Sequence, residues 1–383
     1  MQPKKKALFV TTVGNFLRLF EWNDVKILQH MNYEIHYAAD FTQLDPETEE
    51  IYRSGRIVRH PLPVSRSPLC FRKNTAAYFQ LCRLLKEERF ALIHCHTPMG
   101  GALARLAAVG QREKPFVLYT SHGFHFYRGA PFLSWLLYYP AEYLLARATD
   151  RLITVNEEDY RRALHFPLRE GGRTVRIPGV GLSPEKFAGP GRRRAQLRAA
   201  YGIPEGCFYL LTAGELNRNK NQQVLIRAVA MLKKKQVRLG ICGSGPLCGE
   251  LEALTKRLGV SGQISFLGYR SDLQELCAAA DAFVFPSIRE GFALAPLEAL
   301  AAGLPLITSQ RRDSREYIRH GKNGLICRKN TPREYAAAIS LLIRNPKLCR
   351  RLSDAGRRTA ERYALPETAR IMEQVYEECR RRG

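Results

Sequence analysis

The sequence of 383 residues is longer than a single hydrophobic core usually supports, so its length predicts two domains. Hydrophobic residues make up 45% of the chain, which excludes a largely disordered protein. The formal net charge of +24 favours an anionic partner, and residues 186–383 alone carry 35 basic and 18 acidic side chains. The second half is therefore where we expect an anionic ligand to bind.

Short apolar runs alternate with amphipathic segments along the first half of the chain. This pattern predicts strands at residues 7–10, 34–38, 92–95, 116–120 and 152–155, and helices between them such as 75–88 and 100–109. The most apolar segment is 131–148, PFLSWLLYYPAEYLLARA, but Pro140, Glu142 and Arg147 interrupt it, so no membrane span is expected. We interpret it as a pair of buried helices. Docking on a bilayer surface is the alternative, because Trp and Tyr favour that interface.

A second series of the same kind follows. Strands are predicted at residues 209–213, 238–242, 264–267, 282–285 and 305–308, and helices at 221–234, 247–258, 272–279 and 296–302. Two such series predict an α/β fold with two doubly wound parallel sheets. Glycines and prolines at residues 179–191 mark a linker, and the basic run 192–194 predicts the start of a helix. We expect domains at 1–185 and 186–365, followed by an amphipathic helix at 366–383.

Loops that follow strands in the second series carry glycines and cations. GELNRNKN at 214–221 leads from a strand through a glycine turn to two cations and a helix. Such a loop can hold a phosphate, since lysine supplies a point charge and helix N-termini favour anions. GSGP at 243–246 lets a ligand approach the backbone. Either loop alone is a weak signal, because glycine turns after strands are common.

The stretch REGFALAPLEALAAGLP holds two glutamates, Glu290 and Glu298, on either side of a predicted helix start. Pro296 suits the first turn of a helix and Gly303 its end, which places Glu298 in the first turn and Glu290 on the preceding loop. The amides of residues 291–294 are then expected to be free to meet an anion. The alternative is that Glu298 only complements the helix dipole and Glu290 is a solvated loop residue.

The histidines and cysteines favour structural roles. His94 and His96 share one face of a strand, but without a carboxylate partner they favour packing over a metal site. His125 is expected to be structural. Ten cysteines occur without a Cys-x-x-Cys pair and no signal peptide is evident, which favours reduced and mostly buried thiols, such as Cys95 and Cys242, in a cytosol. No nucleic-acid-binding motif accompanies the basic charge, so no nucleic-acid partner is expected.

Several motifs together resemble one family. They are HCHTPMGG at 94–101, SHGFHFY at 121–127, RIPGVG at 176–181, GELNRNKN, GSGP, FLGYRSD at 266–272, the Glu-x7-Glu stretch and HGKNGLIC at 320–327. This set resembles the retaining GT-B glycosyltransferases of family 4, and most closely those of bacterial exopolysaccharide and capsule assembly. The resemblance implies two facing Rossmann-like domains, with the final helix crossing back to pack on the first.

The resemblance also implies roles for individual residues. Glu298 would bind ribose hydroxyls, Glu290 the donor sugar, and Lys220 the diphosphate, while His122 would face the donor sugar from the first domain. Glu290, His122 and Lys220 are the expected catalytic residues. Further donor-binding residues are expected at Arg218, Gly214, Gly243, Gly245, Gly268, Tyr269, Arg270, Gly291, Phe292, Ala293 and Leu294. Acceptor contacts are expected at Gly14, His96 and Gly100.

Three features depart from the family pattern. Many members carry an arginine where this chain has Glu215, and this reverses a charge near the expected diphosphate; Arg218 is the candidate replacement. The glycine-rich loop after the first strand is reduced to Thr11, Thr12, Val13 and Gly14. Finally, Phe292 and Ala293 do not identify the sugar.

The expected activity is retaining sugar transfer from a nucleotide-diphosphate sugar, with UDP as the expected nucleotide, to a lipid-linked glycan. Neither a metal nor another cofactor is expected. The protein would work in the cytoplasm, peripherally on the inner face of the plasma membrane, with the anionic bilayer as a partner. Two alternatives remain: an enzyme like the UDP-sugar 2-epimerases, and a non-catalytic membrane-docking protein that binds nucleotide sugars.

Overall fold

The structure is a computed structural model that describes residues 4–187 and 194–382. The chain forms two compact units. Unit 1 is Met1–Val180 together with Pro366–Gly383, and unit 2 is Gly181–Leu365. The first boundary thus lies between Val180 and Gly181, where the sequence predicted 185. Part of the predicted linker, and most of the basic run 192–194, lie outside the described residues.

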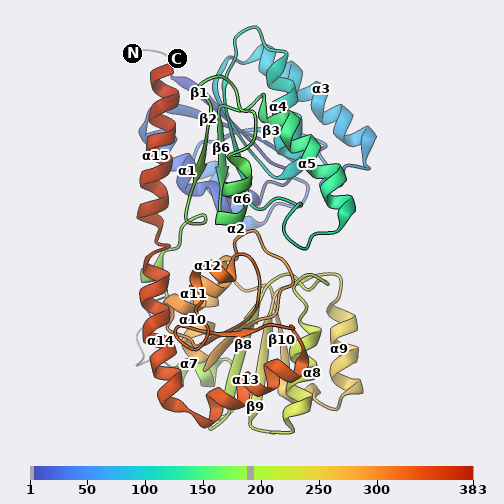
Figure 1. The fold of residues 1–383 in the computed structure, drawn as a ribbon, viewed down its shortest axis with the longest axis vertical. Helices are drawn as coiled ribbons and strands as arrows, with labels where there is room; N and C mark the ends of the chain where they lie inside the picture. The colour runs from blue at the N-terminus through green and yellow to red at the C-terminus, as the bar shows by residue number, and fades with distance from the viewer. Residues whose placement is uncertain (1–3, 188–193, 383) are drawn as a thin grey trace. The chain divides into compact units, whose positions relative to one another are not determined.

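Unit 1 is built on a seven-stranded parallel sheet in the order β3-β2-β1-β4-β5-β6-β7 (Figure 1). The strands are β1 (Lys5–Val10), β2 (Tyr33–Ala39), β3 (Val58–Pro61), β4 (Phe90–His96), β5 (Phe116–Ser121), β6 (Arg151–Thr154) and β7 (Arg173–Arg176). The chain order reverses between β1 and β4. In open α/β sheets ligands bind beyond the carboxyl ends of the strands at such a point.

Helices connect these strands. They are the π-helix η1 (Leu17–Glu21), α1 (Trp22–His30), α2 (Pro46–Ser54), α3 (Phe71–Glu87), α4 (Pro98–Val109), α5 (Phe132–Ala146), α6 (Glu157–Ala163) and the final helix α15 (Leu365–Arg382). Residues of α15 from Pro366 on belong to unit 1 (Figure 1). The core between sheet and helices is aliphatic and aromatic, with Leu8, Ile93, Val117 and Phe126 almost wholly buried.

Unit 2 is a six-stranded parallel sheet in the order β10-β9-β8-β11-β12-β13. Its strands are β8 (Phe208–Ala213), β9 (Val237–Cys242), β10 (Ile264–Gly268), β11 (Ala282–Phe285), β12 (Leu306–Ser309) and β13 (Leu325–Cys327). The helices are η2 (Pro184–Lys186), α7 (Arg194–Ala200), α8 (Gln223–Leu232), α9 (Cys248–Arg257), η4 (Ser261–Gln263), α10 (Leu273–Ala279), α11 (Leu294–Ala301), α12 (Ser314–Tyr317), α13 (Pro332–Arg344) and α14 (Pro346–Glu361). The chain order reverses between β8 and β11.

Both units are therefore Rossmann-like, and the predicted α/β fold with two parallel sheets is confirmed. All ten predicted strands are present within a few residues of their expected bounds. The sequence analysis missed β3, β7 and β13. β3 and β7 are short edge strands with mostly exposed or half-buried side chains, VRHP and RTVR, so they lack the apolar pattern that marks a central strand. β13 has only three residues.

The prediction of a buried helix pair at residues 131–148 is wrong. The segment forms one helix, α5, which continues through Pro140. One polar residue, Glu142, lies on the inward face of α5 and is buried. Its carboxylate accepts hydrogen bonds from Arg105 Nη2 at 2.8 Å and from the Tyr119 hydroxyl at 3.0 Å. Many of its apolar side chains point outward, and five of them are more than half exposed: Phe132, Leu133, Leu136, Leu137 and Leu144.

Within the described residues, no helix is both long enough and apolar enough to cross a membrane. The cysteines agree with the sequence analysis in one respect: all ten are free. Cys95 and Cys242 are buried in strands, as predicted, whereas Cys70 is exposed.

Candidate functional site

Three glycine loops meet at the carboxyl edge of the unit 2 sheet. The Gly214 amide donates to the Cys242 carbonyl at 3.0 Å, and the Gly243 amide donates to the Gly268 carbonyl at 2.6 Å. A Cβ on Gly243 would lie 2.1 Å from the Gly214 carbonyl oxygen, and φ at Gly243 is +128°. A side chain there would force the loops apart. A Cβ on Gly245 would lie 2.6 Å from the backbone of Leu216. These glycines thus bring the loops after β8, β9 and β10 together.

Lys220 and Glu290 form the charged centre of this edge. Lys220 lies just before α8 and Glu290 on the loop between β11 and α11, and Nζ of Lys220 lies 2.7 Å from Oε1 of Glu290. The same Oε1 accepts a hydrogen bond from the Ser287 hydroxyl. The ammonium group also lies 5.0 Å from the centre of the Phe285 ring. The pair is partly exposed, with 22% and 15% of the two side chains accessible, so a ligand can reach it.

Asn219 fastens the two loops to each other. Its side-chain amide donates to the Arg289 carbonyl at 2.8 Å and accepts from the Arg289 amide at 3.1 Å, while its own carbonyl accepts from the Ile288 amide at 2.8 Å. These bonds fix the spacing between Lys220 and Glu290. Neither residue was predicted from the sequence, although Asn219 lies inside the motif GELNRNKN and Ser287 lies two residues before the Glu-x7-Glu stretch.

The predicted place of Glu298 in the first turn of its helix is wrong. The helix α11 starts at Leu294, two residues before Pro296, so Glu298 is its fifth residue. The carboxyl group is partly buried and makes no hydrogen bond or ion pair with any other residue that the structure describes. Desolvation raises the pKa of Glu298 from 4.5 to about 7. An unpartnered, desolvated carboxyl group is available to accept hydrogen bonds from ligand hydroxyls.

The expected row of free amides at residues 291–294 is also wrong in part. The Ala293 amide donates to Oδ2 of Asp313 at 3.2 Å. Asp313 is fully buried and paired with the buried Arg311, whose Nε lies 3.0 Å from Oδ1. The buried ion pair therefore anchors Ala293, the residue that precedes α11. The neighbouring Phe292 packs against Tyr317 and Tyr363, with ring centres 5.9 and 5.5 Å away.

The residues proposed to replace the missing cation or to frame a base have surroundings of their own. Arg218 is exposed and lines a cavity of about 570 Å³ between α8 and α9, which neither Lys220 nor Glu290 lines. Glu215 is also exposed and accepts from Asn217 at 2.9 Å. Arg270 is paired with Asp272, whereas Tyr269 is 60% exposed.

In unit 1, three histidines gather at the carboxyl ends of β4 and β5. The rings of His94 and His96 lie 4.1 Å apart, and Nδ1 of His96 lies 3.0 Å from Nε2 of His122. Desolvation lowers the pKa of His122 to about 4 and that of His94 to about 3, so both rings are neutral near pH 7. His94 bonds Tyr376 of α15 and Thr120, each at 2.8 Å. These two contacts give His94 a structural role in packing. Packing was the role that the sequence favoured over metal binding.

The three predicted acceptor-side residues have structural surroundings of their own. His96 is 1% exposed, so its ring can act on a ligand only through a neighbour. The Gly14 amide donates to Asp40 and its carbonyl accepts from Tyr52, both at 2.9 Å. Gly100 allows α4 to approach β1, since a Cβ there would lie 3.1 Å from the Thr11 backbone. Their contact with an acceptor stays a prediction.

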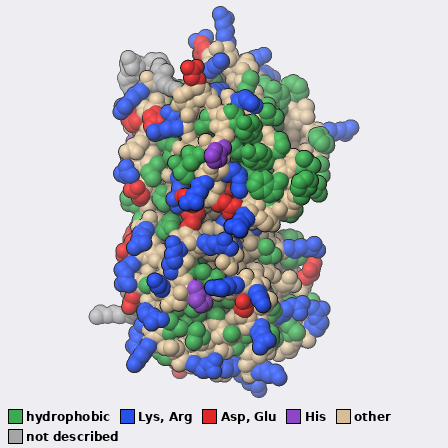
Figure 2. Space-filling model, viewed as in Figure 1, with side chains coloured by type: hydrophobic (Ala, Val, Ile, Leu, Met, Phe, Trp, Pro, Cys, Tyr) green, Lys and Arg blue, Asp and Glu red, His purple; other side chains and the backbone are tan. Residues whose placement is uncertain are grey.

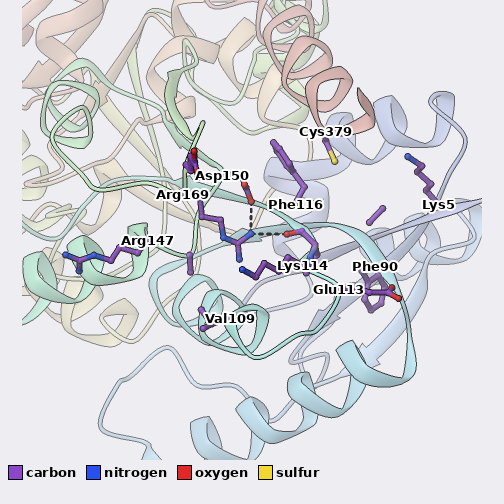
Figure 3. A pocket seen from close by; sticks show the side chains of 14 residues that line it. Lys5, Phe90, Val109, Glu113, Lys114, Phe116, Arg147, Asp150, Arg169 and Cys379 are labelled. Carbon is purple, nitrogen blue, oxygen red and sulfur yellow. Dashed lines mark hydrogen bonds and ion pairs between the residues drawn. The ribbon is translucent and has the colours of Figure 1, made fainter. Parts of the chain in front are cut away.

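Unit 1 also has a cavity of about 770 Å³ (Figure 3), and none of these residues lines it. It is lined by residues at the amino ends of the strands, including Lys5, Phe90 and Phe116, at the opposite edge of the sheet from the histidines. Arg169 and Asp150 pair across part of it at 2.8 Å. The opposite charges of these two side chains neutralise one another. Among the residues described by the structure, no group of three or more His, Cys, Asp or Glu side chains is arranged to hold a metal.

Two family models match the chain, one over each unit. The model described as "Glycosyl transferase 4-like domain" matches residues 25–179, and the model described as "Glycosyl transferases group 1" matches residues 193–359. The second match includes the Lys220–Glu290 pair and Glu298. The first includes His96 and His122.

Several curated proteins are similar over most of the chain. EpsD of Bacillus subtilis (strain 168), a glycosyltransferase by name, is 41% identical over 376 residues, which covers 97% of this chain and 96% of EpsD. A second relative, from Escherichia coli, is named "UDP-Gal:alpha-D-GlcNAc-diphosphoundecaprenol alpha-1,3-galactosyltransferase". It is 28% identical over 264 residues, which covers 67% of each protein.

Solved structures share the fold. HepE of Anabaena in complex with UDP and glucose aligns with a TM-score of 0.79 at 19% identity, covering 98% of this chain and 99% of HepE. WaaG, a glycosyltransferase involved in lipopolysaccharide biosynthesis, aligns with a TM-score of 0.76 at 19% identity, covering 97% and 99% of the two chains. At this level of identity the likeness supports the architecture alone.

Proposed function

This chain belongs to the group 1 glycosyltransferases, and we propose that it moves a sugar from a nucleotide-diphosphate sugar to a lipid-linked glycan with retention of anomeric configuration. The observation that carries the donor side is the combination of the Lys220–Glu290 pair with the unpartnered carboxyl group of Glu298. All three residues lie at the carboxyl edge of one Rossmann-like sheet, where nucleotides bind in such folds.

Donor binding would exchange partners at the Lys220–Glu290 pair. The diphosphate carries negative charge, so it would attract the ammonium group of Lys220. Glu290 would then accept a hydrogen bond from a sugar hydroxyl in place of Lys220. Glu298 would accept from the ribose hydroxyls. A charged acceptor suits a hydroxyl donor, because hydrogen bonds to ionised groups are stronger than those between neutral groups.

The transfer itself would need little covalent chemistry from the protein. The acceptor oxygen forms a bond to the anomeric carbon, the bond from that carbon to the diphosphate oxygen breaks, and the acceptor proton passes to the departing diphosphate on the same face. Lys220 would stabilise the charge that develops on the leaving group. Protein side chains and amides would suffice for this charge, so we propose a reaction that needs no metal.

UDP is the nucleotide that we propose, and a polyprenyl-diphosphate glycan the acceptor class. The Escherichia coli relative is named for a UDP-sugar donor and a diphosphoundecaprenol acceptor, and HepE was crystallised with UDP. We also propose a role in exopolysaccharide or capsule assembly. This part rests on the motifs quoted for the family resemblance.

A lipid-linked acceptor requires contact with a membrane, and the surface of unit 1 suits one. Exposed apolar side chains gather over α3, α4 and α5 (Figure 2), among them Phe71, Phe79, Leu133 and Leu137. The single acid of α5, Glu142, is turned inward. Basic side chains border the patch and are exposed: Arg72, Lys73, Arg128 and Arg147. We therefore propose that this apolar surface, with its basic border, docks on an anionic bilayer.

Binding and transfer test the proposal in that order. Thermal unfolding with UDP, GDP, ADP or dTDP, each with and without magnesium, should show a rise in melting temperature with UDP that magnesium does not change. Radiolabelled UDP-sugars and polyprenyl-diphosphate glycans should then give a longer lipid-linked product. Conversion of the nucleotide sugar without any acceptor would instead indicate an epimerase. Nucleotide binding with no turnover of any pair would indicate a non-catalytic binding protein.

A further inference from the structure

Behind His122 lies a buried series of polar groups that the proposed reaction does not use. His122 Nε2 lies 3.0 Å from Nδ1 of His96. Nε2 of His96 lies 3.3 Å from Oε1 of Glu21, a residue of the π-helix η1. Neither of the last two atoms has a hydrogen-bond partner, although both are buried. The other oxygen of Glu21, Oε2, accepts a hydrogen bond from the Tyr37 hydroxyl.

The protonation of Glu21 follows from its surroundings. The side chain is completely buried, no cation pairs with it within the described residues, and desolvation raises its pKa well above 4.5. Burial without a paired cation therefore favours the neutral acid form of Glu21. Because Oε2 already accepts from Tyr37, the acid proton belongs on Oε1. There it faces Nε2 of His96, and one hydrogen bond would satisfy both unpartnered atoms.

The positions of the remaining protons follow in turn. Burial lowers the pKa of His96 well below 6.5, so its ring is neutral and carries one proton. If Nε2 of His96 accepts from Glu21, its proton is on Nδ1, which donates to Nε2 of His122. The neutral ring of His122 must then carry its own proton on Nδ1. This is the opposite of the tautomer that free histidine prefers.

The neighbouring groups described below do not compete for the ring nitrogens of His96 and His122. Both nitrogens of His94 are taken by Tyr376 and Thr120, so His94 does not compete for His96. The rings of Phe9 and Phe16 lie 6.2 and 5.9 Å from that of His96 and offer no hydrogen bond. Asp24, whose pKa desolvation raises to about 7, bonds Tyr376 rather than His96 or His122.

We infer that Glu21 and His96 are positioning residues that hold His122 in the Nδ1–H tautomer, so that His122 offers a hydrogen-bond donor to its ligand. Nδ1 of His122 makes no hydrogen bond with any residue that the structure describes, which leaves it available. That the ligand is the sugar donor rests on the proposed function. With its proton on Nδ1, His122 favours a ligand oxygen that accepts a hydrogen bond.

The tautomer can be read directly by NMR on the full chain with 15N-labelled histidine, because protonated and bare ring nitrogens differ widely in chemical shift. We expect wild-type His96 and His122 to carry their protons on Nδ1. Glu21→Gln should leave both tautomers unchanged, since an amide can also donate to His96. His96→Leu removes the donor to His122 and should move the His122 proton to Nε2. A wild-type His122 with its proton on Nε2 would overturn the inference, even if neither variant folds.

Kinetics on the same variants separate positioning from folding. His96→Leu should lower kcat about tenfold, comparable to the loss of one or two hydrogen bonds, with a smaller change in KM for the donor. A normal nucleotide-induced rise in melting temperature would show that unit 2 is intact. The NMR readout needs no substrate. If the wild-type protein transfers no sugar, the proposed function fails while the tautomer assignment is still decided.

Discussion

The carboxyl group of Glu298 should make the protein less stable as the pH rises, and replacing it should remove this dependence. Moving its pKa from 4.5 to about 7 makes ionisation about 3 kcal/mol more costly in the folded chain than in the unfolded one. The folded state holds the proton more tightly, so stability is full below about pH 4.5 and falls until about pH 7. At about pH 8 the whole cost is present.

Glu298→Gln keeps the shape of the side chain without the charge. It should raise the melting temperature by several degrees at about pH 8 and by little at about pH 5, since 1 kcal/mol corresponds to about 2–4 °C for a unit of this size. The exposed Glu205 of unit 2 supplies a matched control, and Glu205→Gln should have no such pH-dependent effect. Differential scanning calorimetry at the two pH values measures both.

The affinity for UDP provides a second test of the role of the Glu298 carboxylate. If ribose hydroxyls donate to ionised Glu298, titration calorimetry of wild-type protein should show tighter UDP binding as the pH rises through about 7. Glu298→Gln should bind UDP more weakly and lose this trend. An equal gain in melting temperature at both pH values, or UDP binding that is unchanged in the variant, would refute the reasoning.

Three further predictions concern other parts of the molecule. Lys220→Ala should lower the rate of transfer about 10²-fold, as loss of a charge-stabilising group commonly does, whereas Arg218→Ala, which lines a separate cavity, should change it far less; equal losses would reassign the role. Arg311→Met should destabilise the protein by about 3–5 kcal/mol in chemical denaturation, because it leaves Asp313 buried without its counter-charge, and an unchanged midpoint would contradict this. Leu133→Asp with Leu137→Asp should abolish sedimentation with anionic vesicles, while Leu341→Asp on unit 2, where the leucine is 42% exposed, should not; equal binding by both would rule out α5 as the contact.

The sheets could be predicted from sequence because their central strands are buried on both faces. Runs such as those of β5 and β11 are short and mainly apolar, which is typical of strands buried in a parallel sheet. The apolar pattern of α5, by contrast, does not reveal that many of its side chains are exposed. Its residues are apolar all round, and only the pairing of Glu142 with Arg105, far away in sequence, decides which side faces inward.

At the candidate site, the motifs gave the residues but not their partners. That Lys220 and Glu290 lie together follows from two neighbouring strands ending at one edge, and the sequence analysis anticipated both residues. The engagement of the Ala293 amide by Asp313 depends on a buried ion pair twenty residues further along the chain, which no local pattern marks. Glu21 was missed for the same reason: it reads as one acid in an apolar segment, FLRLFEW, and its importance comes from His96.

The course of the chain has a consequence for biosynthesis. It enters unit 2 and leaves it at adjacent points, since Leu182 pairs with Ala364, and the Leu365 amide donates to the Leu182 carbonyl. Unit 2 is therefore a continuous insertion within unit 1, whose last part, α15, is made only after all of unit 2. On the ribosome, unit 2 can fold as soon as its own residues have emerged. Unit 1 must wait for Tyr376 to reach His94, so the surroundings of the histidines are completed after unit 2 has been made.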